Sequence, residues 1–156
     1  MMRKIEKYRY HSVSDHLELL VKSYEELTGR ILIKYDQLDT LPKLFDQAEF
    51  ALVSHGTEED PVFNYGNRCA LELFEMSFEE LTNLPSRKSA ELPNREERAR
   101  LLAEVTAKGY IENYSGVRIS ATGKRFQIEE ATVWNLINAK GDYCGQAAVF
   151  SKWVMI

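Results

Sequence analysis

Histidine is the side chain best suited to acid–base or ligand chemistry near neutral pH, and His55 stands at the end of an apolar run. Gly56, Thr57 and three acidic residues follow it directly. The imidazole could act as a general base beside an acid, make a polar contact at a pocket mouth, or bond a nearby carbonyl in a turn. No phosphate loop, nucleophile elbow or catalytic carboxylate pair accompanies it, so an enzymatic interpretation would rest on one imidazole.

The other residues that bind metals or form disulfides show no recognised pattern. The two cysteines, Cys69 and Cys144, make no CxxC pair, and the three histidines include no HxxxH spacing. Both cysteines lie in apolar stretches, which favours small buried side chains over a redox pair. We therefore predict no metal site, and the cofactor is unknown.

Several polar and aromatic residues have both a structural and a ligand-binding interpretation. Asn67 can cap the helix that follows it, and Asn64 and Tyr65 can hold the preceding turn. Arg118 can pair with a carboxylate or with an anionic ligand. Trp134 can anchor a core or interface, or stack on a ligand.

Gln146 is the most suggestive polar residue because it lies among small residues of the closing strand. Gly145, Ala147 and Ala148 leave room there for a close neighbour or a ligand. A polar side chain on an inward-facing strand needs a hydrogen-bond partner, and a ligand can be that partner.

The elements that position these residues begin with a helix, predicted from Ser14 as N-cap to about Thr28, with Gly29 as its stop. One face of this helix carries an apolar stripe at helical spacing. The stripe consists of Leu17, Leu20, Val21, Tyr24 and Leu27. An exposed stripe of this size would be a sticky patch. We expect a homodimer through this helix, the outer sheet face, or both, with packing of the helix on its own sheet as the alternative.

The middle of the chain reads as two short strands followed by helices, whereas residues 30–47 are ambiguous between a short strand and a helical turn. The strands are predicted at 49–55 and 62–66. Ser77 and Glu80 form a capping box, so a helix is predicted to begin at Phe78. A longer helix is predicted with Asn94 as N-cap and Gly109 as its stop.

The last third of the chain is predicted to be three antiparallel strands. Alternating apolar residues end near residue 121, and 122–124 forms a hairpin turn into a second strand at 124–137. A shift of the apolar phase between Ile128 and Ala131 indicates a bulge. After a turn at 138–141, one closing strand is predicted to run through Trp153.

Length and charge narrow the class of protein. A chain of 156 residues suits one domain with a real core. It has no apolar run long enough to span a bilayer, and no apolar core follows its basic start, so we expect no membrane association and a cytoplasmic location. The net charge of −4, with basic residues interleaved among acids, argues against direct nucleic-acid binding.

Two segments resemble the MEKHLA family of PAS-like domains: HGTEEDPVFNYGNRCALELFEMSFEELTNLPSRKSAE and GVRISATGKRFQIEEATVWNLINAKGDYCGQAAVF. The resemblance covers about residues 48–153, and the preceding helix is similar to the family's N-terminal extension. It implies an α+β fold with a five-stranded antiparallel sheet and helices mainly on one face. Residues 1–47 would form the helical extension and 48–156 the PAS-like domain.

The family includes stand-alone microbial proteins and the C-terminal domain of plant homeodomain–leucine-zipper regulators, which implies a sensory or regulatory role without a known ligand. PAS-like domains that form a flavin photoadduct carry a Cys in a segment that matches residues 84–89, which contain none. Haem-binding versions take a His from the long helix, which has none here between 94 and 109. We therefore expect a colourless protein, with His55 as the one unusual haem ligand left open.

The favoured function is a sensory module that binds a small ligand between sheet and helices, or relays a signal to a protein partner. A ligand-free interaction or dimerisation adaptor is the alternative, and a small enzyme using His55 is a weaker one. The ligand-binding candidates are His55, Asn64, Tyr65, Asn67, Ser86, Arg87, Arg118, Trp134 and Gln146. No catalytic residue is assigned.

Overall fold

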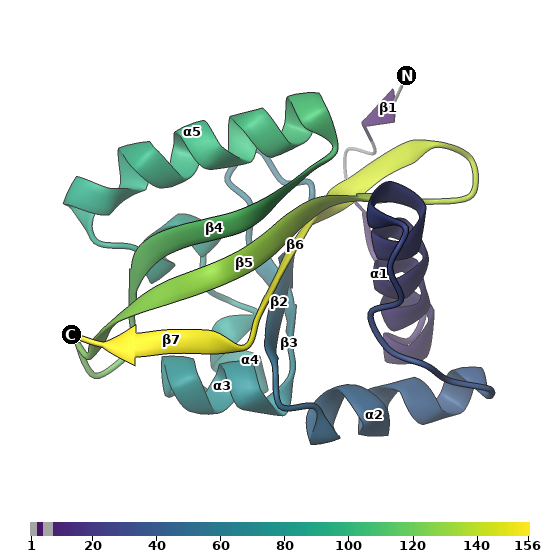
Figure 1. The fold of residues 1–156 in the computed structure, drawn as a ribbon, viewed down its shortest axis with the longest axis horizontal. Helices are drawn as coiled ribbons and strands as arrows, with labels where there is room; N and C mark the ends of the chain where they lie inside the picture. Colours follow the sequence, from purple (N-terminus) through teal and green to yellow (C-terminus); the bar gives the residue numbers. More distant parts are fainter. Residues whose placement is uncertain (1–2, 5–7) are drawn as a thin grey trace.

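An antiparallel sheet forms the centre of the molecule, which a computed structural model describes for residues 3–4 and 8–156 (Figure 1). Its continuous path has the strand order β3-β2-β6-β5-β4. The bounds are Ala51–His55 (β2), Phe63–Gly66 (β3), Tyr110–Ile119 (β4), Arg125–Ile137 (β5) and Asp142–Phe150 (β6). Two short strands, β1 (Arg3–Lys4) and β7 (Lys152–Met155), add to β6 and β5. The predicted α+β fold with a five-stranded antiparallel sheet is confirmed.

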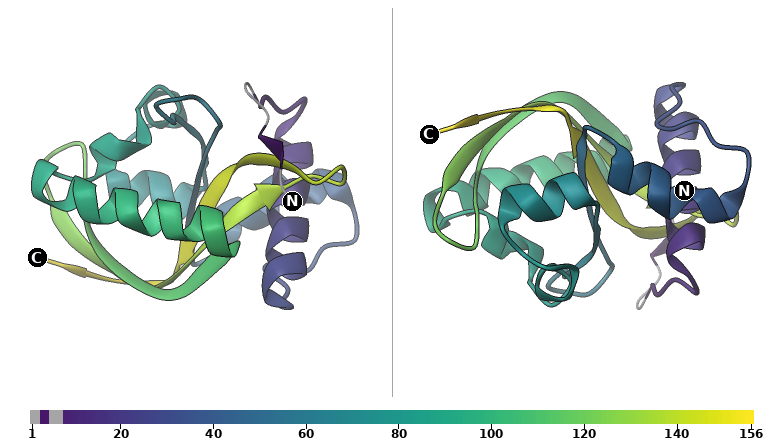
Figure 2. Two further views of the ribbon diagram at one scale, coloured as in Figure 1. Left: turned by 90° about the horizontal axis from the view of Figure 1, so that it is seen from above. Right: turned by 90° about the horizontal axis from the view of Figure 1, so that it is seen from below.

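Helices lie on both sides of this sheet, at different ends of the molecule (Figures 1 and 2). Their bounds are Val13–Thr28 (α1), Leu41–Gln47 (α2), Arg68–Phe74 (α3), Phe78–Leu81 (α4) and Leu92–Lys108 (α5), with 3-10 turns at Leu38–Thr40 (η1) and Ser86–Ser89 (η2). Alternate residues of β2 separate the two sides. Ala51 and Val53 pack in one cluster with α3 and α4, whereas Leu52 packs in another with α1 and α2.

The apolar stripe of α1 is covered by the chain's own sheet. Leu17 and Leu20 are fully buried, and they share a cluster with Trp134 and Leu136 of β5. Tyr24 stands edge-on to the Trp134 ring, with the ring centroids 5.0 Å apart. The predicted alternative, in which the helix packs on its own sheet, is therefore correct for this stripe. A dimer would need another surface.

Two predicted helix starts are wrong. The N-cap of α1 is Ser12, whose hydroxyl accepts from the backbone of Asp15, and Ser14 lies inside the helix. Helix α5 begins at Leu92, two residues before Asn94. The reason is Pro93, which fits the first turn of a helix because that turn needs no intrahelical N–H donor.

Other local predictions are confirmed, with two differences. Asn67 caps α3, the Ser77 capping box begins α4, and the bulge in β5 falls at Glu130, which has a φ of 53°. Residues 31–35 form no strand. The closing strand is interrupted at Ser151, after which β7 continues along the same edge of β5, in the register that β6 has there.

Candidate functional site

A small cavity lies between helices α3 and α5 and the sheet face that they cover. Its volume is about 60 Å³, well below the roughly 300–1,000 Å³ of pockets for drug-sized ligands, so a compact molecule suits it. The wall is mostly apolar, with a few polar groups from separate elements. The lining residues are Val53, Ser54, His55, Phe63, Phe74, Ser89, Arg98, Leu101, Leu102, Tyr114, Arg118, Ile128, Ala131, Val133, Gln146, Ala147, Ala148 and Phe150.

His55 brings an unpaired acceptor to this wall. The residue is 6% exposed, and its Nδ1 lies 3.0 Å from the carbonyl oxygen of Gly56. A carbonyl oxygen only accepts, so Nδ1 carries the hydrogen and Nε2 holds a lone pair. Burial lowers the pKa of His55 to about 4, which keeps the ring neutral near pH 7. No described residue makes a hydrogen bond with Nε2.

Gln146 of β6 lies directly opposite His55 of β2 and is 3% exposed. Its amide nitrogen lies 3.2 Å from Leu102 O and 3.0 Å from both Thr106 Oγ1 and Asn135 Oδ1, so its two hydrogens are shared among these three acceptors. With its hydrogens directed to α5 and β5, the amide has none to give to His55. The remaining Gln146 oxygen is an acceptor like His55 Nε2, so the two cannot satisfy each other.

Two buried arginines lie in the same wall. Arg98 of α5 is 8% exposed and donates to Ser86 Oγ at 2.9 Å. Arg118 of β4 is 7% exposed and donates to Val117 O and to the Tyr114 hydroxyl, with its guanidinium over the Tyr114 ring. Burial, and next the charge of Arg118, lowers the pKa of Arg98 to about 10, so it stays protonated near pH 7. All of these hydrogen-bond partners are neutral.

Two acidic residues of this region, Glu97 and Asp60, make their hydrogen bonds and ion pairs with other side chains. Glu97 accepts from the Tyr114 hydroxyl at 3.0 Å. Asp60 pairs with Arg87 at 3.1 Å on the surface, which makes Arg87 an exposed ion-pair residue outside the cavity lining. Within the described part of the chain, no carboxylate oxygen lies within 4.0 Å of Arg98 or Arg118. No carboxylate of these described residues therefore touches either arginine: the charge of Asp60 acts on Arg98 from a distance, and Glu97 reaches Arg118 only through the shared Tyr114 hydroxyl.

The predicted site residues divide between the two faces of the sheet. His55, Arg118 and Gln146 come together at the cavity, with Ser86 behind Arg98. The other predicted residues lie elsewhere: Asn64, Tyr65, Asn67, Arg87 and Trp134 are outside the lining.

These other residues have identifiable structural roles. Tyr65 and Trp134 are buried in the cluster under α1. Asn67 caps α3, and its amide also donates to the carbonyls of Phe45 and Phe50. Asn64 accepts from the Ser54 hydroxyl at 2.5 Å.

The family model described as the MEKHLA domain matches residues 14–155, which includes α1 and the whole sheet path. The chain belongs to the MEKHLA family.

Plant relatives share this domain at modest identity. Homeobox-leucine zipper protein ATHB-9 of Arabidopsis thaliana is 28% identical over 76% of this chain, and ATHB-14 is 27% identical over 86%. Homeobox-leucine zipper protein HOX9 of Oryza sativa is 24% identical over 88%. The alignments cover only 15–16% of those relatives, so this MEKHLA chain matches a small part of each.

Solved structures show that the MEKHLA domain has a PAS fold. The PAS domain of a protein from Colwellia psychrerythraea superposes with a TM-score of 0.62 at 17% identity, over 78% of this chain and 98% of that one. A PAS domain from a two-component sensor histidine kinase gives 0.58 at 17% identity, over 76% and 95%. An RNA-binding light-oxygen-voltage receptor gives 0.63 at 15% identity, over 76% of this chain and 33% of that one.

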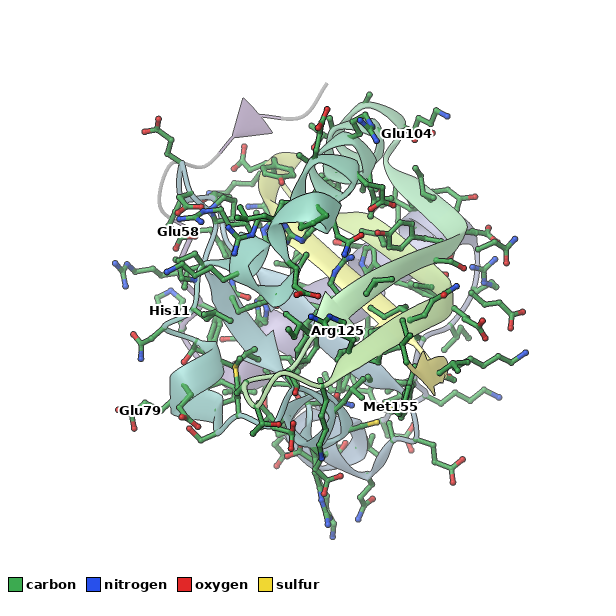
Figure 3. All side chains as sticks on the ribbon, turned by 90° about the vertical axis from the view of Figure 1, so that its left-hand side faces the viewer. His11, Glu58, Glu79, Glu104, Arg125 and Met155 are labelled. Carbon is green, nitrogen blue, oxygen red and sulfur yellow. The ribbon has the colours of Figure 1, made fainter. Side chains whose placement is uncertain are left out.

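Sequence reasoning missed Arg98, which the MEKHLA domain places beside Arg118 in the cavity. The signal was present in the spacing, because Arg98 lies three, four and seven residues before Leu101, Leu102 and Val105. The apolar inward stripe of α5 thus begins with an arginine. Arg125, by contrast, pairs with Glu91 at the surface near the β4–β5 hairpin (Figure 3).

Among residues 3–4 and 8–156, no three His, Cys, Asp or Glu side chains of the MEKHLA domain gather closely enough to hold a metal ion. Over the same described residues, no helix has the length and apolar character needed to cross a bilayer.

Proposed function

We propose that this MEKHLA domain is a sensory module that binds a compact small molecule in the cavity between α5 and the sheet and relays its presence to a protein partner. The observation that carries the proposal is the lone pair of His55 Nε2, which is buried in the cavity wall without a donor. An unpaired buried acceptor costs about 1–3 kcal/mol. A ligand with an O–H or N–H group would remove this cost.

The adaptor function is the second candidate, and the exposed apolar residues of the C-terminal strand favour it. Val154, Met155 and Ile156 are 52%, 52% and 71% exposed. In this case the domain would work by contact between proteins and the cavity would hold water alone. An enzyme is less well supported, because a His55 pKa of about 4 makes the imidazole a weak base.

Native mass spectrometry of freshly purified protein tests the ligand proposal. We expect a bound small molecule in the wild type and its loss in His55→Phe, which removes the acceptor. Arg125→Gln, a surface change outside the cavity, should keep it. If wild type carries no ligand and a broad metabolite panel fails to raise its Tm, the adaptor function replaces the proposal.

A further inference from the structure

We infer that the cavity ligand is a small organic acid that also carries a hydroxyl group, with its carboxylate held by Arg98 and Arg118 and its hydroxyl donating to His55 Nε2. The inference rests on the proposed function and names the chemical class of its ligand. It is built on the cavity lining, the hydrogen bonds of the two arginines and the tautomer of His55.

The charge requirement comes from the arginines. Both arginine residues are more than nine-tenths buried, and their hydrogen-bond partners are two hydroxyls and a carbonyl. A buried charge is normally paired, because removing it from water is costly. Burial is the main cause that lowers the pKa of His55 and of Arg98, and the charges of Arg98 and Arg118, respectively, lower them further, so the three groups interact electrostatically. One anion between the arginines would neutralise this local excess of positive charge.

A carboxylate fits this position better than a larger anion. The guanidinium fork binds a carboxylate through two parallel hydrogen bonds, and each arginine still has N–H groups beyond those already used. The volume of about 60 Å³ admits only a few carbon atoms. The walls beside the arginines include Leu101, Val133 and Ile128, which suit a short carbon chain and not a second charged group.

The hydroxyl requirement comes from the opposite wall. His55 Nε2 and the Gln146 oxygen are both acceptors, and they come from directly paired positions of β2 and β6. A carboxylate oxygen placed there would be repelled by two lone pairs. A hydroxyl donates to the imidazole instead, so one molecule with a carboxylate and a hydroxyl satisfies both walls.

Isothermal titration with three small probes tests the class. Lactate carries both groups, propionate lacks the hydroxyl, and lactamide replaces the carboxylate with a neutral amide. We expect lactate to bind about tenfold or more tightly than either analogue, because each analogue leaves a buried group unpaired. Glycolate and 3-hydroxybutyrate extend the series to shorter and longer chains, and the best-fitting hydroxy acid should show the same dependence on both groups.

Arginine variants separate ligand binding from a structural role. Arg98→Gln and Arg118→Gln should each weaken hydroxy-acid binding about tenfold or more, with Arg125→Gln unchanged. Without ligand, Arg98→Gln should melt at or above the wild-type temperature, since it removes an unpaired buried charge and keeps a donor for Ser86. A lower Tm for this variant would indicate a structural arginine instead.

The outcomes distinguish this inference from the proposed function. If native mass spectrometry finds a neutral molecule in the cavity, and no hydroxy acid binds, the ligand class is wrong and the sensory proposal stands. Equal binding of hydroxy acids by wild type and both arginine variants would also overturn the class. If no molecule of any charge binds, both fail.

Discussion

Gly145 shows how closely the strands that carry His55 and Gln146 approach each other. It has a φ of 128°, and a Cβ built on it would lie 2.1 Å from the carbonyl oxygen of His55. The small residue thus makes room for the backbone of β2. The fold thus requires glycine at position 145. The next residue, Gln146, lines the cavity.

Gly145→Ala should therefore destabilise the protein by roughly 2 kcal/mol or more, because the left-handed backbone and the backbone clash add together. Gly141→Ala is the matched control. It lies in the same hairpin with a φ of 82°, but no atom lies within 4 Å of the added Cβ. Its cost should be about 1 kcal/mol. Urea unfolding measures both, and equal costs would contradict the role of the His55 contact.

A chain of hydrogen bonds on the opposite face of the sheet begins at Tyr8. Its hydroxyl lies 3.0 Å from His16 Nδ1, and His16 Nε2 lies 2.8 Å from Ser54 Oγ. Since the Ser54 hydroxyl donates to Asn64 Oδ1, Ser54 accepts from Nε2–H and Tyr8 donates to Nδ1. His16 is thus bound as a neutral imidazole with a fixed tautomer.

This arrangement predicts acid sensitivity. Burial lowers the pKa of His16 from 6.5 to about 3, so between these values the unfolded chain binds a proton that the folded chain does not. The contribution of His16 to the free energy of unfolding is therefore fully present above about pH 6.5. It falls as the pH drops towards 3, by as much as roughly 5 kcal/mol. Chemical denaturation from pH 7.5 to 4 should show this slope in wild type and a flatter one in His16→Gln. His11→Gln, at an exposed residue, serves as the control, and parallel curves for all three proteins would refute the assignment.

At the scale of elements, α1 acts as part of the core. Leu17 and Leu20 are fully buried against the β5 side of the sheet, so truncating either to Ala should cost about 2–5 kcal/mol. Ile31→Ala, at a residue that is 58% exposed, should change the free energy of unfolding by less than about 0.5 kcal/mol. Guanidinium titrations give both values. A small cost at Leu17 and Leu20 would mean that α1 docks only loosely.

Local signals in the sequence predicted most elements, because the capping groups act within a few residues. The capping box at Ser77 and the amide cap at Asn67 need only neighbours in the chain. The start of α5 was missed where two local signals competed, Pro93 within the first turn against Asn94 as cap. Neither signal requires knowledge of the fold.

The site was predicted less completely, since it depends on which face of the sheet each residue occupies. His55, Gln146 and Arg118 meet at the cavity, whereas Tyr65 and Trp134 point to the α1 side. If all helices are expected mainly on one face of the sheet, the sequence gives no reason to separate the cavity residues from the residues that face α1. The position of α1 on the other face supplies that reason.

For the whole molecule, strand β2 connects the two sides. Ser54 bonds His16 on one face, and the next residue, His55, reaches the cavity on the other. Ligand binding at His55 should therefore alter the protection of the segment around Tyr8 and α1. Hydrogen exchange with and without a bound hydroxy acid measures this, using α4 as an internal reference. A change confined to α5 and the cavity strands would exclude this route of relay.

The C-terminal strand β7 lies beside β5 at the C-terminal end of the chain (Figure 1), and two of its four residues are exposed and apolar. In the described part of the chain β7 pairs with β5 alone, so its other edge has unpaired backbone groups. Val154 and Met155 are each 52% exposed there, the strand contains no proline, and its one charged residue, Lys152, is paired with Glu130 at the other end of the strand. With the α1 stripe covered, this edge is the surface on which we expect a second copy of the chain to pair.

Self-association through β7 should be concentration-dependent and sensitive to one added charge. Val154→Lys places a charge on the open edge and should shift the protein to monomer, because pairing two such edges would bury unpaired ammonium groups. Leu92→Lys is the matched control, since Leu92 is 74% exposed on a helix, α5, and offers no open strand edge. Light scattering from micromolar to millimolar concentration, with circular dichroism to verify folding, compares the three proteins. A wild type that stays monomeric throughout, or a Val154→Lys protein that dimerises as well as wild type, would show that β7 is not the contact. Loss of the dimer in Val154→Lys alone would place the partner strand beside residues 152–155, where β5 links the edge to the cavity wall at Ile128 and Val133.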